Sequence, residues 1–388
     1  MDFSVSQDIQ DIRKAVAELC AGFPDKYWRD LDRTGAYPSE FVQALTDAGW
    51  LAALIPTEYD GAGLGLYEGA IILEEINARG GNAISAHAQM YTMGTVLKHG
   101  TPEQKQKYLP AIARGELRLQ AFGVTEPNAG SETTKLETRA VKKGDKYVVN
   151  GRKIFISRTQ YSDMMLLLAR TTPYDELEDK TRGLSVFLVD LKEAVARGQI
   201  VVTPIEVMLN HHTTELAIQD LEIPAENLVG QEGMGFRYII DSWNPERVLV
   251  ASEAIGDGRW FVERGAKYAS ERVVFGRPIG QNQGVQFPLA QAHARIEAAA
   301  LMRDKAAWLF DNNQKCGFEA NAAKMLASQA SWEAANACMD THGGYGFAVD
   351  FDVERKFRET RLLITAPISN NMVLNFIGQN VLGMPRSY

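Results

Sequence analysis

The chain of 388 residues has few cysteines, no excess of basic charge and no long apolar run. Its three cysteines, Cys20, Cys316 and Cys338, lie far apart and form neither a metal-binding spacing nor a disulfide framework. The formal net charge is −8, and no basic stripe marks a nucleic-acid surface. No uncharged apolar stretch reaches the roughly 18 residues that cross a membrane. We therefore expect a protein of a reducing compartment that holds no metal and binds neither nucleic acid nor membrane.

The amino-terminal stretch MDFSVSQDIQDIRKAV lacks the basic start and the apolar run that are typical of a secretory leader. Together with the scattered cysteines, this favours the cytoplasm. The length indicates two or three domains, and an apolar share of 45% is ample for a full core.

Residues 1–118 have the period of helices. Apolar residues between Ile9 and Leu19 fall on one face of a helix that Ser6 would cap. Thr101-Pro-Glu-Gln104 combines an N-cap, a proline at the first helical position and a glutamine three residues on, so a helix should follow. Gly61-Ala-Gly-Leu-Gly65 looks like a nucleotide-binding fingerprint, but no βαβ unit surrounds it, and we predict a loop.

Residues 119–229 have the pattern of strands. Asn150-Gly151 lies between two β-rich runs within 147–156 and predicts a hairpin. Further strands are predicted by short apolar runs at 164–169, 184–189, 201–203 and 214–218. Because no helical segments alternate with them, the pattern indicates a small β domain rather than a parallel sheet.

From residue 230 to 388 the helical period returns. The run 328–337 is rich in helix formers, and no proline occurs from Leu289 to Ala366. We therefore predict an α+β multidomain protein with a helical domain at 1–118, a β domain at 119–229 and a second helical domain at 230–388. This order of segments is uncommon.

Ala121–Ser131 is the most informative stretch of the chain. An apolar run ends at Thr125, Glu126-Pro127 turns the backbone, and Asn128–Gly130 leave it lightly covered before the hydroxyl of Ser131. Small residues and main-chain N–H groups let a planar or phosphorylated ligand approach the backbone closely. An ordinary turn at the end of a strand is the alternative.

With this motif and this order of segments, the chain resembles the acyl-CoA dehydrogenase family over essentially its whole length. Four further matches are correctly spaced. They are Phe155-Ile-Ser157, where the family has Trp-Ile-Thr; Ser270–Ile279 followed by Gln283, which reaches a neighbouring subunit's flavin; His342–Gly346, the glycine loop; and Arg358–Arg361, which leads into the family's catalytic loop. The resemblance implies a helical N-terminal domain, a barrel-like β domain and a C-terminal four-helix bundle.

The resemblance also implies an FAD enzyme that converts an acyl-CoA thioester into the 2-enoyl-CoA and passes electrons to an electron-transferring flavoprotein. It implies a homotetramer built as a dimer of dimers. The implied cofactor contacts are Phe122, Val124, Thr125, Gly130, Ser131, Phe155, Ser157, Arg272, Phe275, Gln283, Gly343, Gly344, Pro367 and Ser369. The implied substrate contacts are Ser131, Trp243, Arg247 and Ile368.

Some of these residues have simpler explanations. Phe155 is as easily a core side chain as a flavin neighbour, since aromatic residues in strands usually pack inward. Arg272 could lie on a helix surface, and the glycine loop could be a tight turn. Asp340 stands where many relatives have a glutamine near the flavin diphosphate, so we expect its carboxylate to turn away or meet a cation. His211-His212 lack a metal-ligand partner and are read as loop or subunit-contact residues.

The usual catalytic base of the family is missing. Relatives have the glutamate of a Tyr-Glu-Gly-Thr loop where this chain has Pro367, and no Asp or Glu occurs from Leu362 to Tyr388. In isovaleryl-CoA and long-chain acyl-CoA dehydrogenases the base is instead a glutamate just before an arginine on an earlier helix. Glu246-Arg247 matches that pattern.

We predict that Glu246 is the base and lies in the first turn of a helix, with Asn244 as the N-cap and Pro245 at an early position. The positive end of the helix dipole would then lower its pKa, while burial would raise it. An N-terminal helix charge that faces solvent is the alternative for Glu246.

Pro367 also lacks the N–H that holds the thioester carbonyl in relatives. We hypothesise that the loop shifts so that Ile368 donates instead; the alternative is that the flavin ribityl group carries more of this role. Ala366 and Pro367 are smaller than Tyr-Glu and would leave room for a branched or bulky acyl group, but the sequence does not fix the acyl length. Two other functions remain open, a flavin oxidase or monooxygenase and a non-catalytic partner of an active paralogue.

Overall fold

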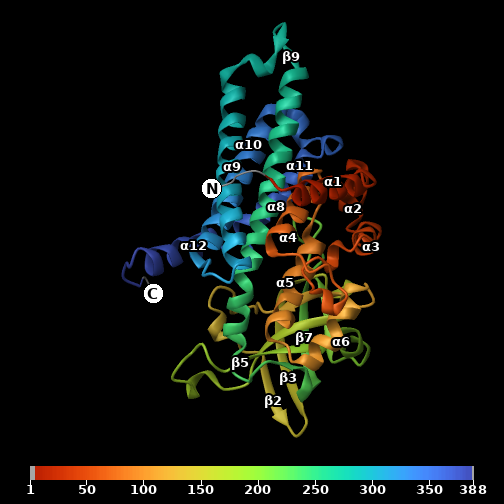
Figure 1. The fold of residues 1–388 in the computed structure, drawn as a ribbon, viewed down its shortest axis with the longest axis vertical. Helices are drawn as coiled ribbons and strands as arrows, with labels where there is room; N and C mark the ends of the chain where they lie inside the picture. The colour runs from red at the N-terminus through yellow and green to blue at the C-terminus, as the bar shows by residue number, and fades with distance from the viewer. Residues whose placement is uncertain (1–4, 387–388) are drawn as a thin grey trace. The chain divides into compact units, whose positions relative to one another are not determined.

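A computed structural model describes residues 5–386 (Figure 1). The chain forms two compact units. Unit 1 takes in Met1–Phe41, Gly65–Ala83 and Asn244–Tyr388, and unit 2 takes in Val42–Leu64 and Ile84–Trp243. The three predicted domains divide the chain differently and stay a prediction. The interpretation of the amino-terminal stretch rests in part on residues 1–4, which lie outside the described residues.

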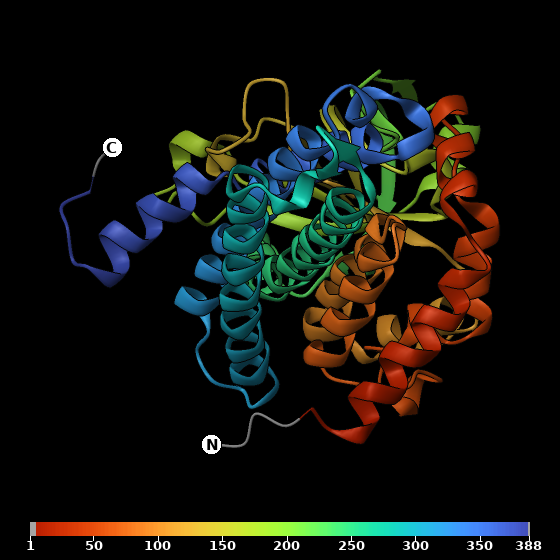
Figure 2. The ribbon, with the colours of Figure 1, turned by 90° about the horizontal axis from the view of Figure 1, so that it is seen from above.

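Helices make up most of unit 1. They are α1 (Gln7–Ala21), α2 (Asp25–Thr34), α4 (Leu66–Ala78), most of α8 (Gly235–Glu271), α9 (Gln283–Asp311), α10 (Gly317–His342), α11 (Val353–Arg361) and α12 (Asn370–Phe376), while α3 (Ser39–Asp47) begins here. A hairpin of β9 (Val273–Val274) and β10 (Arg277–Pro278) joins α8 to α9, and these two helices run side by side (Figures 1 and 2). Within residues 5–386, no helix combines the length and the apolar character needed to cross a bilayer.

Four helices of unit 1 share one core. It is built from small side chains such as Ala254 on α8, Ala299 on α9 and Ala334 on α10, with larger ones such as Phe261 and Ile296 between them. Alanine at these positions lets helices approach closely, and Val353 brings α11 into the same cluster. The predicted C-terminal four-helix bundle is confirmed.

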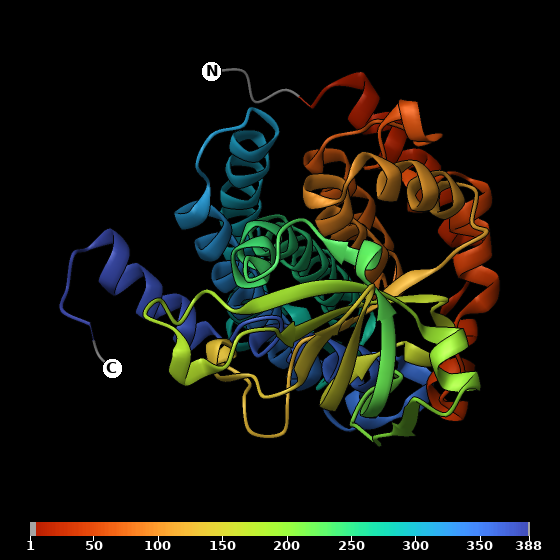
Figure 3. The ribbon, with the colours of Figure 1, turned by 90° about the horizontal axis from the view of Figure 1, so that it is seen from below.

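Unit 2 is built on one eight-stranded sheet in the order β6-β7-β3-β2-β4-β5-β8, with β1 also paired to β4 (Figure 3). The strands are β1 (Leu119–Gly123), β2 (Arg139–Lys143), β3 (Lys146–Ser157), β4 (Met164–Arg170), β5 (Leu184–Asp190), β6 (Ile200–Pro204), β7 (Thr213–Pro224) and β8 (Leu228–Val229). The helices of the unit are α5 (Ile84–His99), α6 (Pro102–Ala113) and α7 (Leu191–Ala196). Pairing is antiparallel except for β1 with β4 and β2 with β4. The predicted middle β domain is therefore confirmed.

The central strand β4 is buried on both faces, which explains its unbroken apolar run. Leu166 and Leu168 pack with Val96 of α5 and Leu109 of α6. Alternate residues such as Leu167 belong to a second core formed with β3, β5 and β7. Because successive side chains of a strand point to opposite faces, two cores require apolar residues at every position.

The predicted helix starts are confirmed. The Ser6 side chain accepts a bond from the N–H of Ile9 at 3.4 Å. Thr101 accepts from the N–H of Gln104 at 3.2 Å, and Gln104 returns a bond to the N–H of Thr101 at 3.1 Å, which completes a capping box. Gly61–Gly65 forms the predicted loop before α4.

The predicted hairpin at Asn150-Gly151 is wrong. β3 runs through both residues, and the chain reverses earlier, at Gly144-Asp145 between β2 and β3. Gly151 instead sits at a bulge, where a Cβ atom would lie 2.4 Å from the Oγ1 of Thr138. Asn150 bonds across to Asp220. Glycine is needed here for close approach of two chain segments, not for a turn.

Candidate functional site

The motif at 121–131 follows β1 in unit 2 and forms a tight turn. Glu126 and Ala129 exchange main-chain hydrogen bonds of 3.1 Å each. The buried Glu126 carboxylate accepts from the N–H groups of Glu137 at 2.6 Å and Thr138 at 2.9 Å. The acidic side chain of the motif therefore fixes the turn and does not face a ligand.

Lys153 on β3 completes this anchor. Its ammonium is fully buried and donates to Glu126 Oε1 at 2.8 Å and to the carbonyl of Val124 at 2.9 Å. Burial lowers the pKa of Lys153 to about 8, against the attraction of Glu126. Burial alone would raise the pKa of Glu126, but the neighbouring Lys153 lowers it below its usual value. The N–H of Ile154 holds the carbonyl of Thr125 at 2.9 Å, so the backbone on which Thr125 sits is rigid.

Beyond this anchor the motif is open. Val124 and Thr125 are half-buried, and Gly130 and Ser131 are exposed. A Cβ atom on Gly130 would meet nothing within 4 Å. Phe122, in contrast, is buried in the core of unit 2, with its ring centre 6.3 Å from that of Tyr91.

Phe155 is not a core side chain. It is 59% exposed and has a φ of +57°, at a second register shift of β3 between Lys153 and Ile156. The shift lets Phe155 point out of the sheet while Ile156 stays buried. The alternative interpretation of Phe155 as core filler is therefore wrong.

Ser157 is bonded to a residue that was not predicted to belong to the site. Its hydroxyl lies 2.8 Å from the Nδ1 atom of His211, which also lies 3.2 Å from the hydroxyl of Thr213. Burial first, and then the charge of Arg158, hold the pKa of His211 well below 6.5, so the imidazole is neutral at neutral pH. His211 does lie in a loop, as predicted. Only the pairing of Ser157 with Thr213 in the sheet could have brought it next to Ser157.

Glu246 and Arg247 lie on α8 in unit 1. Both side chains are buried, at 5% and 7% exposure. Arg247 donates to the side chain of Asn244 at 3.1 Å, and burial lowers its pKa against the attraction of Glu246. The same attraction favours the ionised carboxylate of Glu246. A solvent-facing helix charge, the alternative weighed for Glu246, does not fit this burial.

The prediction that Glu246 lies in the first turn of a helix is wrong. α8 begins at Gly235 and continues through Pro245, so Glu246 lies about three turns inside it, away from the positive end of the helix dipole. Asn-Pro is a common helix start, but here Ile239 before the proline and Val250 after it are both buried. Packing on both sides keeps the helix continuous despite the N–H that Pro245 lacks.

The segment that replaces the family's catalytic loop lies between α11 and α12. Pro367 is exposed, and Ile368 and Ser369 are half-buried. Ser369 caps α12 and accepts from the N–H of Met372 at 3.4 Å. Trp243, an implied substrate contact, is half-buried and packs against the core of unit 2.

The residues implied to serve a neighbouring subunit's cofactor are exposed on unit 1. Phe275 at the tip of the β9–β10 hairpin is fully exposed, with a φ of +52°. The exposed guanidinium of Arg272 lies 5.8 Å from the ring centre of Tyr345, and Gln283 is exposed at the start of α9.

The glycine loop follows α10. Gly343 ends the helix with a φ of +56°, so it has a structural role as the alternative interpretation held. Gly344 is exposed, and a Cβ atom there would meet nothing within 4 Å. Asp340 is exposed near the end of α10.

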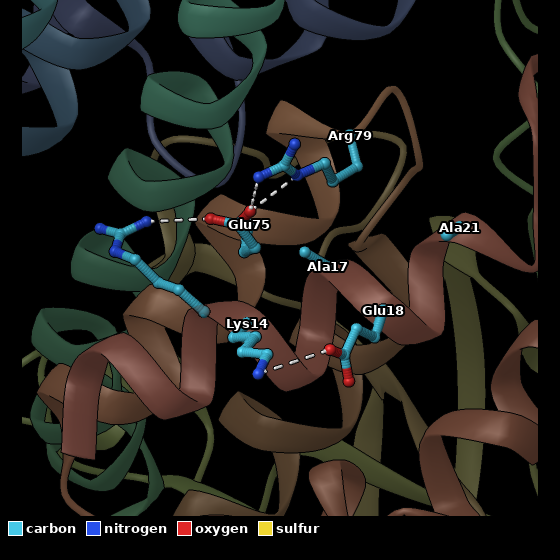
Figure 4. A pocket seen from close by; sticks show the side chains of 7 residues that line it. Lys14, Ala17, Glu18, Ala21, Glu75 and Arg79 are labelled. Atoms are coloured by element: carbon cyan, nitrogen blue, oxygen red, sulfur yellow. Dashed lines mark hydrogen bonds and ion pairs between the residues drawn. The ribbon is translucent and has the colours of Figure 1, made fainter. Parts of the chain in front are cut away.

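A polar pocket between α1 and α4 of unit 1 is unrelated to these residues (Figure 4). Its charges are paired with each other: Glu75 with Arg79 at 2.7 Å and with Arg13 at 3.1 Å, and Lys14 with Glu18 at 4.0 Å. It therefore gives no charge to an incoming ligand.

The side chains described above fit a bound flavin nucleotide. Phe155 offers an exposed aromatic face, Thr125, Ser131 and Ser157 offer hydroxyls, and Arg272 offers an exposed guanidinium suited to phosphate. The open backbone at Gly130 and Gly344 leaves room for a group that lies against the main chain. This combination, on a helix–sheet–helix chain, defines a flavin-dependent oxidoreductase.

Comparison with known proteins identifies the family. Profiles described as the N-terminal, middle and C-terminal domains of acyl-CoA dehydrogenase match residues 6–116, 121–221 and 233–382. Acyl-CoA dehydrogenase FadE12 of Mycobacterium tuberculosis is 36% identical, over 100% of this chain and 99% of that protein. Cyclohex-1-ene-1-carbonyl-CoA dehydrogenase of Syntrophus aciditrophicus is 34% identical, over 91% and 84%.

Among solved structures, butyryl-CoA dehydrogenase from Megasphaera elsdenii superposes with a TM-score of 0.92 at 27% identity, covering 98% of this chain and 100% of that chain. The chain belongs to the acyl-CoA dehydrogenase family, and it is an oxidoreductase of this kind with FAD as its cofactor.

Proposed function

We propose that the enzyme removes the α-proton and the β-hydride of an acyl-CoA thioester and yields the 2-enoyl-CoA, with Glu246 as the base. One observation supports this most strongly. A glutamate buried beside an arginine is present on α8, in a chain with no acidic residue from Leu362 to Tyr388. A carboxylate that must stay ionised yet accept a proton benefits from such a buried position next to a cation.

Each group has a separate task in this proposal. The Glu246 carboxylate takes the α-proton, and the electron pair of that C–H bond becomes the new double bond. Bound FAD supplies the acceptor for the β-hydride. Arg247 keeps Glu246 ionised before the transfer. The proposed cofactor contacts are Phe122, Val124, Thr125, Gly130, Ser131, Phe155, Ser157, Pro367 and Ser369, with Arg272, Phe275, Gln283, Gly343 and Gly344 serving the cofactor of a neighbouring subunit.

The thioester carbonyl needs hydrogen-bond donors as negative charge develops on its oxygen. Pro367 has no N–H, so the N–H of Ile368 is proposed for this role, with Ser131, Trp243 and Arg247 as further substrate contacts. Loss of one such donor typically costs about 3 kcal/mol of transition-state stabilisation.

The proposed substrate has a branched or bulky acyl group, and the proposed electron acceptor is an electron-transferring flavoprotein. Two observations support the bulky acyl group. Ala366 and Pro367 are small, and a relative at 34% identity is described as a dehydrogenase of an alicyclic acyl-CoA.

A homotetramer is proposed because unit 1 exposes many large apolar side chains, and exposed apolar patches of this kind often mark subunit contacts. They include Phe275, Phe287, Leu301, Trp308, Leu374, Leu382 and Met384. The cytoplasm is proposed because Cys20, Cys316 and Cys338 are free and buried.

The test of the base is half-reduction of the flavin by acyl-CoA without oxygen. We expect Glu246→Gln to retain FAD but to bleach about a hundredfold more slowly than wild type, because the amide cannot accept the α-proton. Glu253→Gln is the matched control, since Glu253 is a buried glutamate of the same helix, and it should bleach at nearly the wild-type rate. A panel of linear, branched and alicyclic acyl-CoAs identifies the substrate.

Other outcomes would contradict parts of the proposal. An unchanged rate in Glu246→Gln would place the base elsewhere. Rapid reoxidation of the bleached wild-type flavin by air would indicate an oxidase or a monooxygenase. Purified protein that stays colourless with added FAD would indicate a non-catalytic subunit.

A further inference from the structure

Lys324 of α10 is a fully buried lysine whose ammonium contacts three oxygen atoms of one short segment. It donates to the carbonyl of Ile364 at 3.2 Å, to the carbonyl of Ile368 at 2.7 Å and to the side-chain oxygen of Asn370 at 2.9 Å. The segment 364–370 stands where relatives carry their catalytic loop, and Pro367 lies at its centre. All three donors of the ammonium are thus used on this segment.

Asn370 extends the contact to a second residue of α10. Its side-chain N–H donates to the hydroxyl of Ser328 at 3.1 Å, and Ser328 lies one helical turn after Lys324. The segment is therefore fastened to one face of α10 at both of its ends.

The surroundings of Lys324 differ from those of the other buried lysines. Lys153 pairs with Glu126, and Lys356 pairs with Asp257 at 2.5 Å and with Glu359. Among the described residues, the printed partners of Lys324 are neutral oxygens only. Burial, and then the charge of Arg247, lower its pKa to about 7. A buried ammonium without a carboxylate is costly, which argues that its three donors serve a purpose beyond packing.

The two carbonyl contacts also fix the direction of the backbone. In a trans peptide the N–H points opposite to the C=O. With the Ile368 carbonyl turned toward α10, the N–H of the same peptide unit points away from it. Lys324 therefore decides which side of the segment presents carbonyls and which presents N–H groups.

We propose that Lys324 is a positioning residue for the dehydrogenation. Its ammonium holds 364–370 in the one conformation in which Pro367 and Ile368 reach the cofactor and the thioester carbonyl. The inference rests on the proposed function, because it assigns those contacts to this segment. In this chain the segment has lost the family's glutamate, and its remaining task is to hold the substrate in place.

The experiment compares three holoenzyme variants with wild type by hydrogen–deuterium exchange and by steady-state kinetics. Lys324→Met keeps the length of the side chain and removes its donors. The amides of the peptide covering 362–372 should then exchange about tenfold faster. The value of kcat/KM should fall between about tenfold and a hundredfold at unchanged FAD content, because misplaced contacts slow the reaction. Lys305→Met is the matched control, since Lys305 is exposed and pairs with Glu319 at 3.0 Å; both measurements should stay at wild-type values.

Two substitutions of Asn370 keep the test decisive if Lys324→Met does not fold. Asn370→Leu removes one acceptor and should speed exchange of the segment and lower kcat/KM. Asn370→Asp keeps the acceptor and adds a charge opposite the ammonium, so it should slow exchange and retain kcat/KM within a few fold of wild type.

Three results would overturn the positioning role: unchanged exchange of 362–372 in Lys324→Met, faster exchange with an unchanged kcat/KM, or equal effects of the two Asn370 variants. Failure of the proposed function gives a different result. In that case wild type bleaches with no acyl-CoA, while exchange of the segment still depends on Lys324.

Discussion

Glu126 and Lys153 form a buried ion pair that holds the cofactor-binding motif from behind. The pair is bonded to the main chain at Val124, Glu137 and Thr138, so neither charge is left for a ligand. An acidic residue in a binding motif is thus a structural element here. The groups left for the flavin are the half-buried Thr125 and the open backbone beyond it.

The first prediction at this scale compares two lysines of β3. Lys153→Met leaves the buried Glu126 carboxylate without its cation and should lower the free energy of unfolding by about 3 to 5 kcal/mol. Lys146→Met removes an exposed pair with Glu222 and should change it by less than about 1 kcal/mol. Chemical denaturation of each variant, followed by fluorescence, measures the difference. FAD content should fall in Lys153→Met alone; equal stability of the two variants would contradict the anchoring role of the pair.

At the scale of elements, β3 shows how one strand can carry two different functions. Two register shifts divide it, one at Gly151 and one before Ile156. The first lets Thr138 come close, and the second turns Phe155 outward next to the buried Ile156. A regular strand would have placed Phe155 and Ser157 on one face and alternated strictly from there.

The prediction at this scale compares two glycines. Gly151→Ala puts a Cβ atom 2.4 Å from the Thr138 hydroxyl oxygen and 2.7 Å from its Cα atom, so the two segments must separate. We expect it to cost about 2 to 3 kcal/mol of unfolding free energy. Gly144→Ala has open space at the real hairpin turn and pays only for its φ of +64°, about 1 kcal/mol. Thermal or denaturant unfolding ranks the two, and the reverse order would place the turn at 150–151 after all.

At the scale of the whole molecule, exposed apolar side chains suggest contacts with further copies of the chain. Phe275 at the β9–β10 hairpin is the most exposed of them, on a unit whose four-helix core is otherwise well filled. A fully exposed phenylalanine held at positive φ is costly unless something covers it.

Phe275→Asp should therefore weaken assembly. We expect sedimentation velocity to show wild type as a tetramer and the variant as smaller species with reduced FAD content, because a charge at a buried contact is strongly unfavourable. Val201→Asp changes an apolar residue of β6 in unit 2 with 56% exposure and serves as the control, which should remain tetrameric. A monomeric wild type that retains FAD would contradict the proposed assembly.

Local signals in the sequence determined much of the fold. Capping residues at Ser6 and Thr101, the apolar run of β4 and the helical period after residue 230 depend on neighbours a few positions apart. Family motifs in register also indicated the enzyme class, and the absence of acidic residues after Leu362 directed attention to Glu246 before any coordinates existed.

Tertiary packing decided the rest, because the decisive contacts join residues that are distant in the chain. Asn150-Gly151 reads as a turn and Asn244-Pro245 as a helix start, yet contacts with Thr138 in one case and burial on both sides in the other override those local preferences. The bonds from His211 to Ser157 and from Lys324 to 364–370 leave no trace in local sequence. Only the folded chain brings these groups within hydrogen-bonding distance and excludes the water that would otherwise satisfy them.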